Sequence, residues 1–501
     1  MTNQEKWKRL STILDEAEAY GRAIGKLNFD MECCAPEEGM EQAGDDMALL
    51  GKHIHALTHS PEYAALVGEL HADGEGLSFA QRKTVEHLWE RYEKEKNLTE
   101  EFDHAWSVAA NRAYGKWLTA KKASDFSLFR DSLAEVVDFT RKAIDLRDKK
   151  PATYYNACLD DTEKGGSEAQ MDAFFGALKE RIVPLMRRIQ AEGKPIREDF
   201  LTRSCPIPEQ ERFSHYLLEA EGLRKSALVL MTTEHPFTTE FGPHDVRVTT
   251  HYFEDNFISN IFSTLHEGGH ALFMQNEPEE FWREHTAGSM TNAMHECISR
   301  FYENIIGRSE AFIHFVYPKL QEISGDTFSD VSERELYEAV NIARPSLIRT
   351  EADELTYSLH ILIRYELEKL MLNGEITVDE IPVLWNAKYK EYLGLDVPDD
   401  AQGCLQDVHW TQSYGYFPSY ALGSAYGAQI LAAMEKDFDV FAAVREGKLT
   451  AVRDWLKEHV FSIASVSTPD EWIRAITGEP LDPDYFLTYL ERKYSALYEL
   501  K

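Results

Sequence analysis

The chain has 501 residues, of which 43% are hydrophobic and 28% are charged, a composition typical of a globular protein with a sizeable core. Its formal net charge of -33 comes from 86 acidic and 53 basic residues, so nucleic acid and anionic membranes are unfavourable partners. No apolar run approaches the roughly 18 residues that a membrane-spanning helix needs.

The cysteines and the first residues bear on the cellular compartment. The six cysteines form no CxxC pair and no zinc-ribbon spacing, which predicts reduced thiols in a reducing compartment. The opening residues, MTNQEKWKRL, are polar where a signal peptide needs an apolar core. We therefore expect a cytoplasmic location.

Helical spacing of apolar residues dominates the chain, together with strong helix formers. Only DVRVTTHYF, at 245–253, alternates like a strand and is rich in β-branched and aromatic residues. We predict one mainly α-helical domain over 1–501 with a small β-sheet, in which 1–130 could form a helical covering layer. The predicted helices cover 5–30, 80–120, 124–148, 167–192, 208–231, 257–275, 291–316, 346–372, 379–392, 420–434, 450–460 and 483–499.

The segment TLHEGGHALF contains an HExxH motif made of His266, Glu267 and His270. On a helix the two histidines lie only about 40° apart, one turn up the same face, where two imidazoles can hold one zinc ion. Glu267 then projects to the side, towards the water that zinc activates. The alternative is a surface helix with scattered histidines. The flanks are apolar on several sides, which favours a buried helix whose polar groups need a partner.

Two glycines inside this motif need a physical reason, because each costs a helix roughly 1 kcal/mol relative to alanine. Gly269 lies about 60° from His266 and borders the metal face, where we expect a side chain to fill space that substrate needs. Gly268 falls near the opposite face, where we expect another element to approach closely.

A catalytic zinc ion takes three protein ligands and keeps one position open. The helix predicted around TNAMHECISRFYENII supplies Glu296 as the predicted third ligand. Glu303 lies seven residues on and is either a partner for a zinc histidine or half of a salt bridge with Arg300. His295 is predicted to be a core histidine rather than a ligand.

Six short motifs together resemble one family, the Taq-type thermostable carboxypeptidases, which are HExxH metallopeptidases related to the angiotensin-converting-enzyme type. The one departure is Cys297, where the family usually has a serine or glycine, and its neighbour Glu296 is intact. The motifs are HPF at 235–237, DVRVT at 245–249, HEGGH at 266–270, HEC at 295–297, IRTEAD at 348–353 and GCLQDVHW at 403–410.

The resemblance implies a mostly α-helical, two-lobed fold with a deep cleft and a short sheet beside the active site. It also implies one divalent metal, usually zinc, and the release of single amino acids from the free carboxyl terminus of peptides. Family members are commonly homodimers.

The mechanism expected from these residues is metal-assisted amide hydrolysis. Zinc on His266, His270 and Glu296 lowers the pKa of water towards about 7. Glu267 takes the proton as general base and later delivers it to the leaving amine.

Two further residues are candidates for stabilising the oxyanion. They are His409, within QDVHW, and Tyr420, within YFPSY, because family members place a histidine and a tyrosine at about this separation. The alternatives are an ordinary core aromatic at Tyr420 and a structural role for His409.

A carboxypeptidase must also bind the free α-carboxylate of its substrate. Arg349 is our candidate, since a guanidinium binds a carboxylate in bidentate fashion. Asp353, four residues later on the same predicted helix, is placed to orient Arg349, unless the two merely pair with each other. His235 and Arg247 fall in family motifs, and Arg247, on the small strand, is predicted to be structural.

Two other functions stay open at this point. A related zinc endo-oligopeptidase would release internal fragments rather than single terminal residues. A non-catalytic binding protein with a degenerate site would hydrolyse nothing, although the intact Glu267 argues against it.

Overall fold

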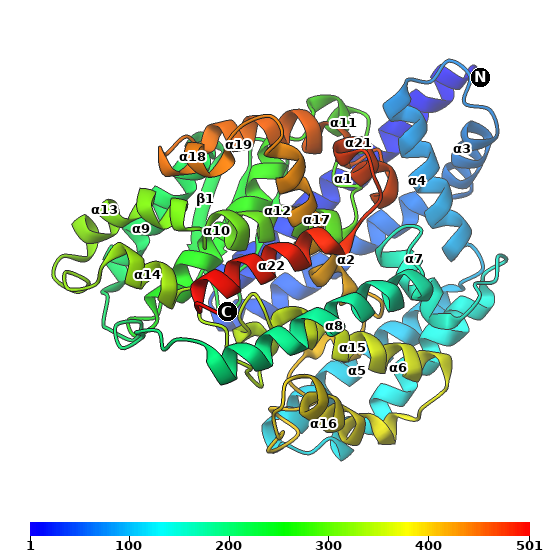
Figure 1. Ribbon diagram of the computed structural model, residues 1–501. Helices are drawn as coiled ribbons and strands as arrows, with labels where there is room; N and C mark the ends of the chain where they lie inside the picture. Colours follow the sequence, from blue (N-terminus) through cyan, green and yellow to red (C-terminus); the bar gives the residue numbers. More distant parts are fainter.

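The computed structural model describes the chain from Met1 to Lys501 and confirms a mainly α-helical fold with a small β-sheet (Figure 1). Most buried apolar side chains belong to one core of 102 residues, which spans the chain from Ala113 to Tyr498. This single core surrounds the predicted HExxH helix.

The first four helices build a layer with a small core of its own. Trp7 and Leu10 of the first helix cluster with Val67 and Leu70 of the third and with Val85 of the fourth, separately from the main core. Apolar spacing predicts neither the second nor the third helix. These four helices are α1 (Asn3–Cys33), α2 (Met40–Thr58), α3 (Pro61–Ala72) and α4 (Phe79–Glu95).

The long helix predicted over 80–120 is divided in two. The hydroxyl of Thr99 accepts a hydrogen bond from the N–H of Phe102, and this cap begins a new helix. The helices that follow are α5 (Glu100–Ala123), α6 (Ser127–Leu146), α7 (Tyr154–Thr162), α8 (Glu168–Glu192) and α9 (Ile207–Glu221).

The β-sheet has three strands in the order β1-β3-β2, with β3 parallel to β1 and antiparallel to β2. The predicted strand is confirmed as β3, but the helix predicted over 208–231 is wrong at its end. Gly222 ends α9 in the left-handed conformation, at φ 93°, and the chain then extends into β1. The strands are β1 (Leu228–Thr232), β2 (Thr238–Glu240) and β3 (Val246–Thr250).

The helix that carries the HExxH motif lies against this sheet and is buried on nearly every side, as its apolar flanks predict. The single helix predicted over 291–316 is interrupted by a π-helical turn. The elements of this region are α10 (Phe257–Asn276), α11 (Glu279–Arg283), α12 (Asn292–Arg300), the π-helical turn (Phe301–Ile306), α13 (Glu310–Ser324) and α14 (Glu333–Ala339).

The helix predicted over 346–372 begins only at Tyr357. Asp353 accepts hydrogen bonds from the N–H groups of Leu355 and Thr356 and so holds the turn that precedes this start. The remaining elements are α15 (Tyr357–Asn373), α16 (Ile381–Tyr392), α17 (Pro418–Met434), α18 (Val440–Arg445), α19 (Leu449–Leu456), a second π-helical turn (Lys457–Phe461), α20 (Ser462–Ala464), α21 (Pro469–Thr477) and α22 (Pro483–Leu497).

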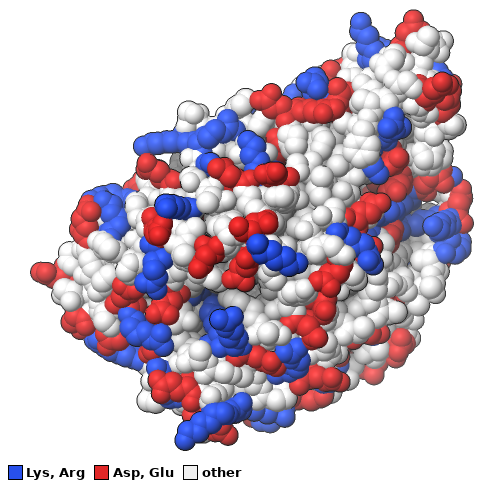
Figure 2. All heavy atoms as spheres, turned by 45° about the horizontal axis from the view of Figure 1, so that its top comes forward, with Lys and Arg blue, Asp and Glu red and all other residues white.

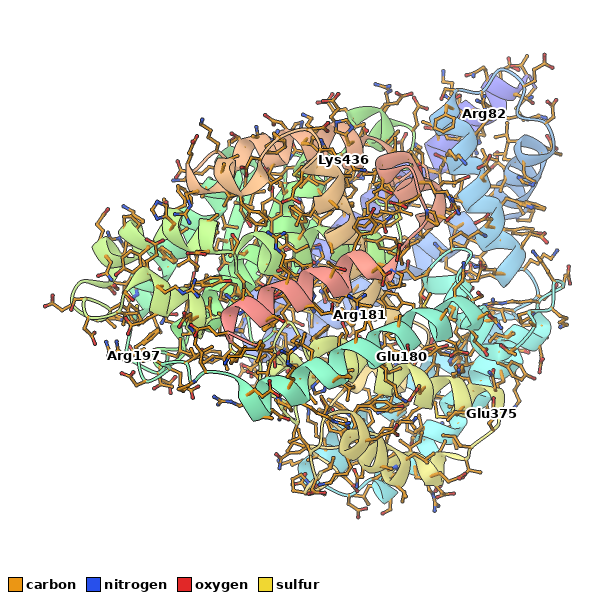
Figure 3. All side chains as sticks on the ribbon, in the orientation of Figure 1. Arg82, Glu180, Arg181, Arg197, Glu375 and Lys436 are labelled. Carbon is orange, nitrogen blue, oxygen red and sulfur yellow. The ribbon has the colours of Figure 1, made fainter.

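The helices gather in two groups around α17. In Figure 1, α9, α13, α14 and α18 lie to the left, whereas α5, α6, α15 and α16 lie below. Helices α8 and α22 run side by side across the front. Arg181 of α8 joins them, because it donates to Asp484 at 2.7 Å and to Glu491 at 2.6 Å, both on α22 (Figure 3).

No helix of the fold has both the length and the apolar character that crossing a membrane requires. On the face shown in Figure 2, acidic and basic side chains are intermixed, despite the net charge of -33. The excess of acid is therefore not gathered into one patch on that face.

Candidate active site

The structure brings the three predicted metal ligands together. His266 and His270 lie one turn apart on α10, and Glu296 reaches them from α12. One ligand atom from each lies within 4.8 Å of the other two, and Nε2 of His266 is 3.7 Å from Oε2 of Glu296. Two imidazoles and one carboxylate are a donor set of catalytic zinc sites, so these residues fit the metal that the motif predicts.

Gly268 and Gly269 let two other helices approach α10. A Cβ on Gly268 would collide with the carboxylate of Glu221 at the end of α9, which confirms the close approach predicted there. A Cβ on Gly269 would lie 2.8 Å from the carbonyl oxygen of Ile298 in α12. The prediction that Gly269 leaves room for substrate is therefore wrong, because the backbone of the helix that carries Glu296 fills that room.

Helix α17 approaches α12 from its other side. A Cβ on Gly423 would lie 2.8 Å from the Cβ of Glu296 and 3.0 Å from the backbone nitrogen of Cys297. Helix α12 is thus held between α10 and α17 by a glycine contact on each side. These two contacts fix the position of Glu296 relative to the histidines of α10.

Both contacts left open for Glu303 are present, one with a candidate metal histidine and one with Arg300. Nδ1 of His266 lies 2.8 Å from Oε2 of Glu303, and Arg300 donates to the same carboxylate oxygen at 3.2 Å. Burial alone would raise the pKa of Glu303, but the positive charge of Arg300 and the bond to His266 outweigh it and lower the pKa to about 2. An ionised Glu303 holds a proton on Nδ1 of His266 and leaves Nε2 free for a metal.

His295 is not one of the three clustered ligands, in agreement with its prediction as a core histidine, but it contacts one of them. Its Nδ1 lies 2.5 Å from Nδ1 of His270, so one of the two rings donates and the other accepts. Burial lowers the pKa of His295 to about 4, so its ring is neutral near pH 7. His295 therefore orients His270, as Glu303 orients His266.

Glu267 is oriented by the sheet. The hydroxyl of Thr238, the first residue of β2, donates to Oε2 of Glu267 at 2.7 Å. Burial raises the pKa of Glu267 above its ordinary value, although the charge of His266 and the bond from Thr238 act in the opposite direction. A carboxyl whose pKa moves towards the working pH is a better proton carrier.

Arg349 lies in a 3-10 turn before α15, not within a helix. Its Nη2 donates to Asp407 at 2.9 Å, its Nε lies 3.2 Å from the same carboxylate, and its Nη1 donates to the hydroxyl of Tyr357 at 2.9 Å. The prediction that Asp353 orients Arg349 is wrong, because Asp353 bonds to the turn before α15 and Asp407 contacts Arg349 instead. These contacts leave one N–H free on each Nη of Arg349.

Tyr420 lies beside Arg349 and close enough to Glu296 for its negative charge to add to the effect that burial has on the pKa of the phenol. The guanidinium carbon of Arg349 is 5.2 Å from the centroid of the Tyr420 ring. Burial raises the pKa of Tyr420 well above its ordinary value, and the charge of Glu296 contributes. Tyr420 is therefore a protonated phenol that can donate a hydrogen bond.

His409 reaches Tyr420 through another tyrosine. The His409 and Tyr416 rings stack with centroids 5.9 Å apart, and the Tyr416 and Tyr420 rings meet edge to face at 5.2 Å. Burial lowers the pKa of His409 to about 4, so its ring is neutral near pH 7. His409 and Tyr416 line a cavity of about 230 Å³.

The two remaining motif residues have different surroundings. His235 is exposed in the loop between β1 and β2. Arg247 on β3 donates to Asp245 at 2.9 Å and lies over the rings of Phe29 and Phe241, at 5.0 and 4.8 Å from their centroids. These contacts agree with the structural role predicted for Arg247.

Sequence reasoning missed four residues that contact the site: Thr238, Tyr357, Asp407 and Tyr416. Asp407 lies inside the quoted QDVHW segment, two residues before His409, so a signal for it was present. The contact between Thr238 and Glu267 depends on how the sheet packs on α10, and no spacing rule along the chain predicts it.

Comparison with known proteins identifies the family of the chain. Residues 9–494 match the carboxypeptidase Taq (M32) metallopeptidase family. Carboxypeptidase 1 of Bacillus subtilis is 37% identical over 98% of this chain and 99% of its own length. Thermostable carboxypeptidase 1 of Thermus thermophilus is 34% identical over 99% of this chain and 100% of its own.

A solved structure shows the same fold. The M32 carboxypeptidase from Deinococcus radiodurans R1 superposes with a TM-score of 0.95 at 31% identity, over 99% of this chain and 100% of that one. Family match, sequence identity and fold cover nearly the whole chain, so the predicted resemblance is confirmed. The chain belongs to the carboxypeptidase Taq (M32) metallopeptidase family and is a metallocarboxypeptidase, a peptide hydrolase.

Proposed function

We propose that the protein releases single amino acids from the carboxyl terminus of peptides, with one zinc ion held by His266, His270 and Glu296. The observation that carries the proposal is the convergence of these three side chains within 4.8 Å, next to the carboxylate of Glu267. Cobalt or another divalent ion is the alternative metal. When bound, the metal supplies Lewis-acid chemistry, since it polarises a carbonyl and lets water lose a proton near neutral pH.

Glu267 acts as the proton carrier of the reaction. Thr238 occupies its Oε2, which leaves Oε1 to take a proton from the attacking water and to deliver it to the leaving amine. Because Thr238 fixes the rotation of the carboxylate, Glu267 need not reorient between the two steps.

Tyr420 and His409 are proposed as the donors that stabilise the negative charge developing on the scissile carbonyl oxygen. Both are held in their donor forms by burial, Tyr420 as a phenol and His409 as a neutral imidazole. The charge of Glu296 acts on Tyr420, and Tyr416 links Tyr420 to His409.

Arg349 is proposed to bind the terminal carboxylate of the substrate through the free N–H on each Nη. Asp407 and Tyr357 hold the guanidinium in one plane, so little entropy is lost when the carboxylate binds. A site that requires this carboxylate would cut only next to a free terminus, which separates the protein from an endopeptidase.

Digestion of a defined peptide by the zinc-loaded protein, followed by mass spectrometry, tests the proposal. We expect successive loss of single residues from the carboxyl end, with little cleavage of the same peptide amidated at that end. Internal fragments would support a zinc endo-oligopeptidase instead, and no cleavage with zinc or cobalt supplied would support a non-catalytic binding protein.

Three substitutions assign the roles. Glu267→Gln should retain zinc and lower kcat by about 10²- to 10⁴-fold. Tyr420→Phe should lower kcat by about 10²- to 10³-fold, whereas Tyr426→Phe, another buried tyrosine of α17, should not. Arg349→Lys, which keeps a charge beside Asp407, should raise KM for peptides with a free terminus.

We also propose that the active enzyme is a cytoplasmic homodimer. The cysteine pattern supports the compartment, and the family resemblance supports the oligomeric state. Sedimentation at micromolar concentration would give twice the chain mass of 57.5 kDa, and a single-chain mass would contradict the homodimer.

A further inference from the structure

Glu163 is a buried carboxylate that belongs to none of the sequence motifs. It directly follows α7, is only 3% exposed and lies between the starts of α12 and α17. Its Oε1 accepts two hydrogen bonds, from the backbone N–H of Ala293 at 2.7 Å and from the hydroxyl of Ser419 at 2.8 Å. Both donors are neutral, and no lysine or arginine forms an ion pair with Glu163.

Both donors lie at the start of a helix that carries part of the proposed active site. Ala293 is the second residue of α12, and Glu296 follows one turn later. Ser419 is the second residue of α17 and directly precedes Tyr420. At α12, Glu163 accepts from one of the first N–H groups of the helix, which have no acceptor within the helix, whereas at α17 it accepts from a side-chain hydroxyl. One carboxylate thus lies at the amino-terminal ends of both helices.

The same two helices meet again one turn further along α17. There the Cβ position of Gly423 falls 2.8 Å from the Cβ of Glu296, so no side chain separates the helices. Glu163 holds their ends, and Gly423 sets how closely they pack. The position of Tyr420 relative to Glu296 depends on both contacts, because each of these residues lies within one turn of them.

We propose that Glu163 is a positioning residue, which clamps the first turns of α12 and α17 together and so sets the Tyr420 hydroxyl relative to the metal ligand Glu296. Glu163 touches neither substrate nor metal and acts through the two helices. This inference rests on the proposed function, because Tyr420 and Glu296 have these roles only in the metallopeptidase mechanism.

Steady-state kinetics of the zinc-saturated full chain test the clamp. Glu163→Ala removes both hydrogen bonds and should lower kcat by about 10- to 100-fold, as loss of a supporting contact does at metal sites. KM should change by no more than about threefold, since the groups that bind substrate remain. Ser419→Ala removes only the bond to α17 and should cause a smaller loss of kcat.

Glu277→Ala is the matched control. Glu277 is 4% exposed and accepts hydrogen bonds from the N–H of Gly288 and the hydroxyl of Ser465. Its alanine variant therefore loses one backbone and one hydroxyl hydrogen bond, as Glu163→Ala does, but at a place outside α12 and α17. It should lower stability but leave kcat unchanged. If Glu163→Ala changes kcat no more than Glu277→Ala does, Glu163 is merely structural and the proposal is overturned. If Glu163→Ala fails to fold, Ser419→Ala decides the question against the same control.

A double substitution separates positioning from general weakening. In a Tyr420→Phe background, Glu163→Ala should lower kcat by much less than it does in the wild type, because the group that it positions is already gone. If Glu163→Ala lowers kcat by the same factor in both backgrounds, the proposal that Glu163 acts by positioning Tyr420 is overturned. An inactive wild-type protein would instead overturn the proposed function, so the two failures are distinguishable.

Discussion

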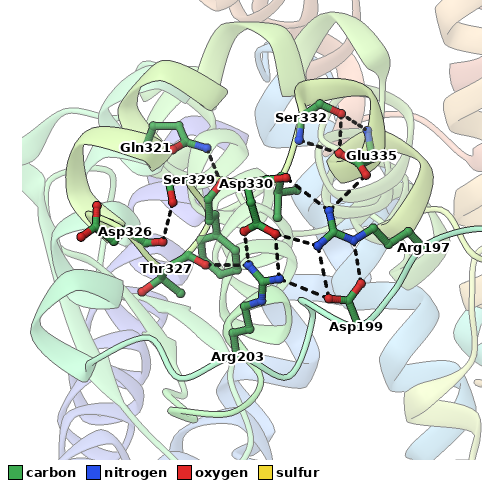
Figure 4. Close-up of polar contacts among 12 residues, drawn as sticks. Arg197, Asp199, Arg203, Gln321, Asp326, Thr327, Ser329, Asp330, Ser332 and Glu335 are labelled. Atoms are coloured by element: carbon green, nitrogen blue, oxygen red, sulfur yellow. Dashed lines mark hydrogen bonds and ion pairs between the residues drawn. The ribbon is translucent and has the colours of Figure 1, made fainter.

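Two clusters pair arginine with carboxylates, one at the surface and one in the interior of the fold. The surface network ties the loop after α8 to the loop before α14, and in Figure 4 Arg197 and Arg203 face Asp330 from two sides. Asp199 and Glu335 complete it. The buried cluster consists of His266, Glu296, Arg300 and Glu303 and surrounds the proposed metal position.

Solvent exposure separates the two clusters. Side chains of the surface network are 28% to 60% exposed, so water screens their attraction and each pair contributes little. Side chains of the buried cluster are only 10% to 18% exposed, so each charge has lost most of its hydration. Buried charges of this kind are poor stabilisers unless every partner is present. The fold accepts that cost beside the proposed metal position, where ligand orientation matters, and also in separate buried pairs such as Arg364 with Glu368.

Among the substitutions that test this difference, Glu303→Gln should have the largest effect on stability and metal affinity. It removes the negative partner of both His266 and Arg300, so we expect a loss of about 3 kcal/mol in the free energy of unfolding. Metal affinity or kcat should fall by about 10- to 100-fold, because Nδ1 of His266 loses its carboxylate. Zinc titration and denaturant unfolding measure the two effects.

A matched control for this prediction lies at the surface. Nδ1 of His314 lies 3.0 Å from the carboxylate of Glu333, which repeats the pair of His266 and Glu303 in an exposed position. Glu333→Gln should change neither zinc affinity nor kcat. If Glu333→Gln lowers zinc affinity and kcat as much as Glu303→Gln does, burial of the histidine–carboxylate pair is not what makes it important.

The pH dependence of stability gives a second comparison. The pKa of Glu303 is about 2 in the folded, metal-free protein and about 4.3 in an unfolded chain, so the unfolded state binds more protons between these values. The stability from Glu303 is therefore fully present above about pH 4.3 and is lost as the pH falls towards 2. The free-energy difference between wild type and Glu303→Gln should shrink from pH 5 to pH 3. A constant difference would contradict the low pKa.

The metal site could be predicted because its signal is local. His266, Glu267 and His270 occupy one turn of α10, where spacing alone fixes their relative directions. Glu303 follows Glu296 by seven residues, and this periodicity left open a contact with a metal histidine and a salt bridge with Arg300; the structure has both. Apolar flanks correctly predicted that the helix is buried.

Predictions failed where tertiary packing replaced local spacing. The i,i+4 rule paired Arg349 with Asp353, but the residues before Tyr357 are not helical, and Asp407 comes from a distant loop. Strand β1 was placed in a helix, because the apolar run LVLMT has no period that distinguishes the two. Gly222 was the available stop signal.

Gly269→Ala tests the corrected role of that glycine and should have an intermediate effect. The added Cβ lies 2.8 Å from the backbone of α12, so we expect a loss of about 1–3 kcal/mol in stability. Because α12 carries Glu296, zinc affinity should fall together with kcat. Gly176→Ala is the control, since a Cβ there meets nothing within 4 Å and should, if anything, stabilise α8. Lost activity with full zinc affinity would restore the original interpretation that Gly269 leaves room for substrate.

Asp330→Asn should have the smallest effect, although Asp330 contacts two arginines. Both arginines keep other acceptors and water, so no buried charge is stranded. We expect an unchanged kcat and a small shift of the unfolding midpoint at low salt, which disappears at high salt because screening removes it. Asp326→Asn, in the same loop but in no ion pair, should show no salt-dependent shift. If Asp330→Asn lowers the unfolding midpoint equally at low and high salt, the surface network contributes to stability without screening, as the buried cluster does.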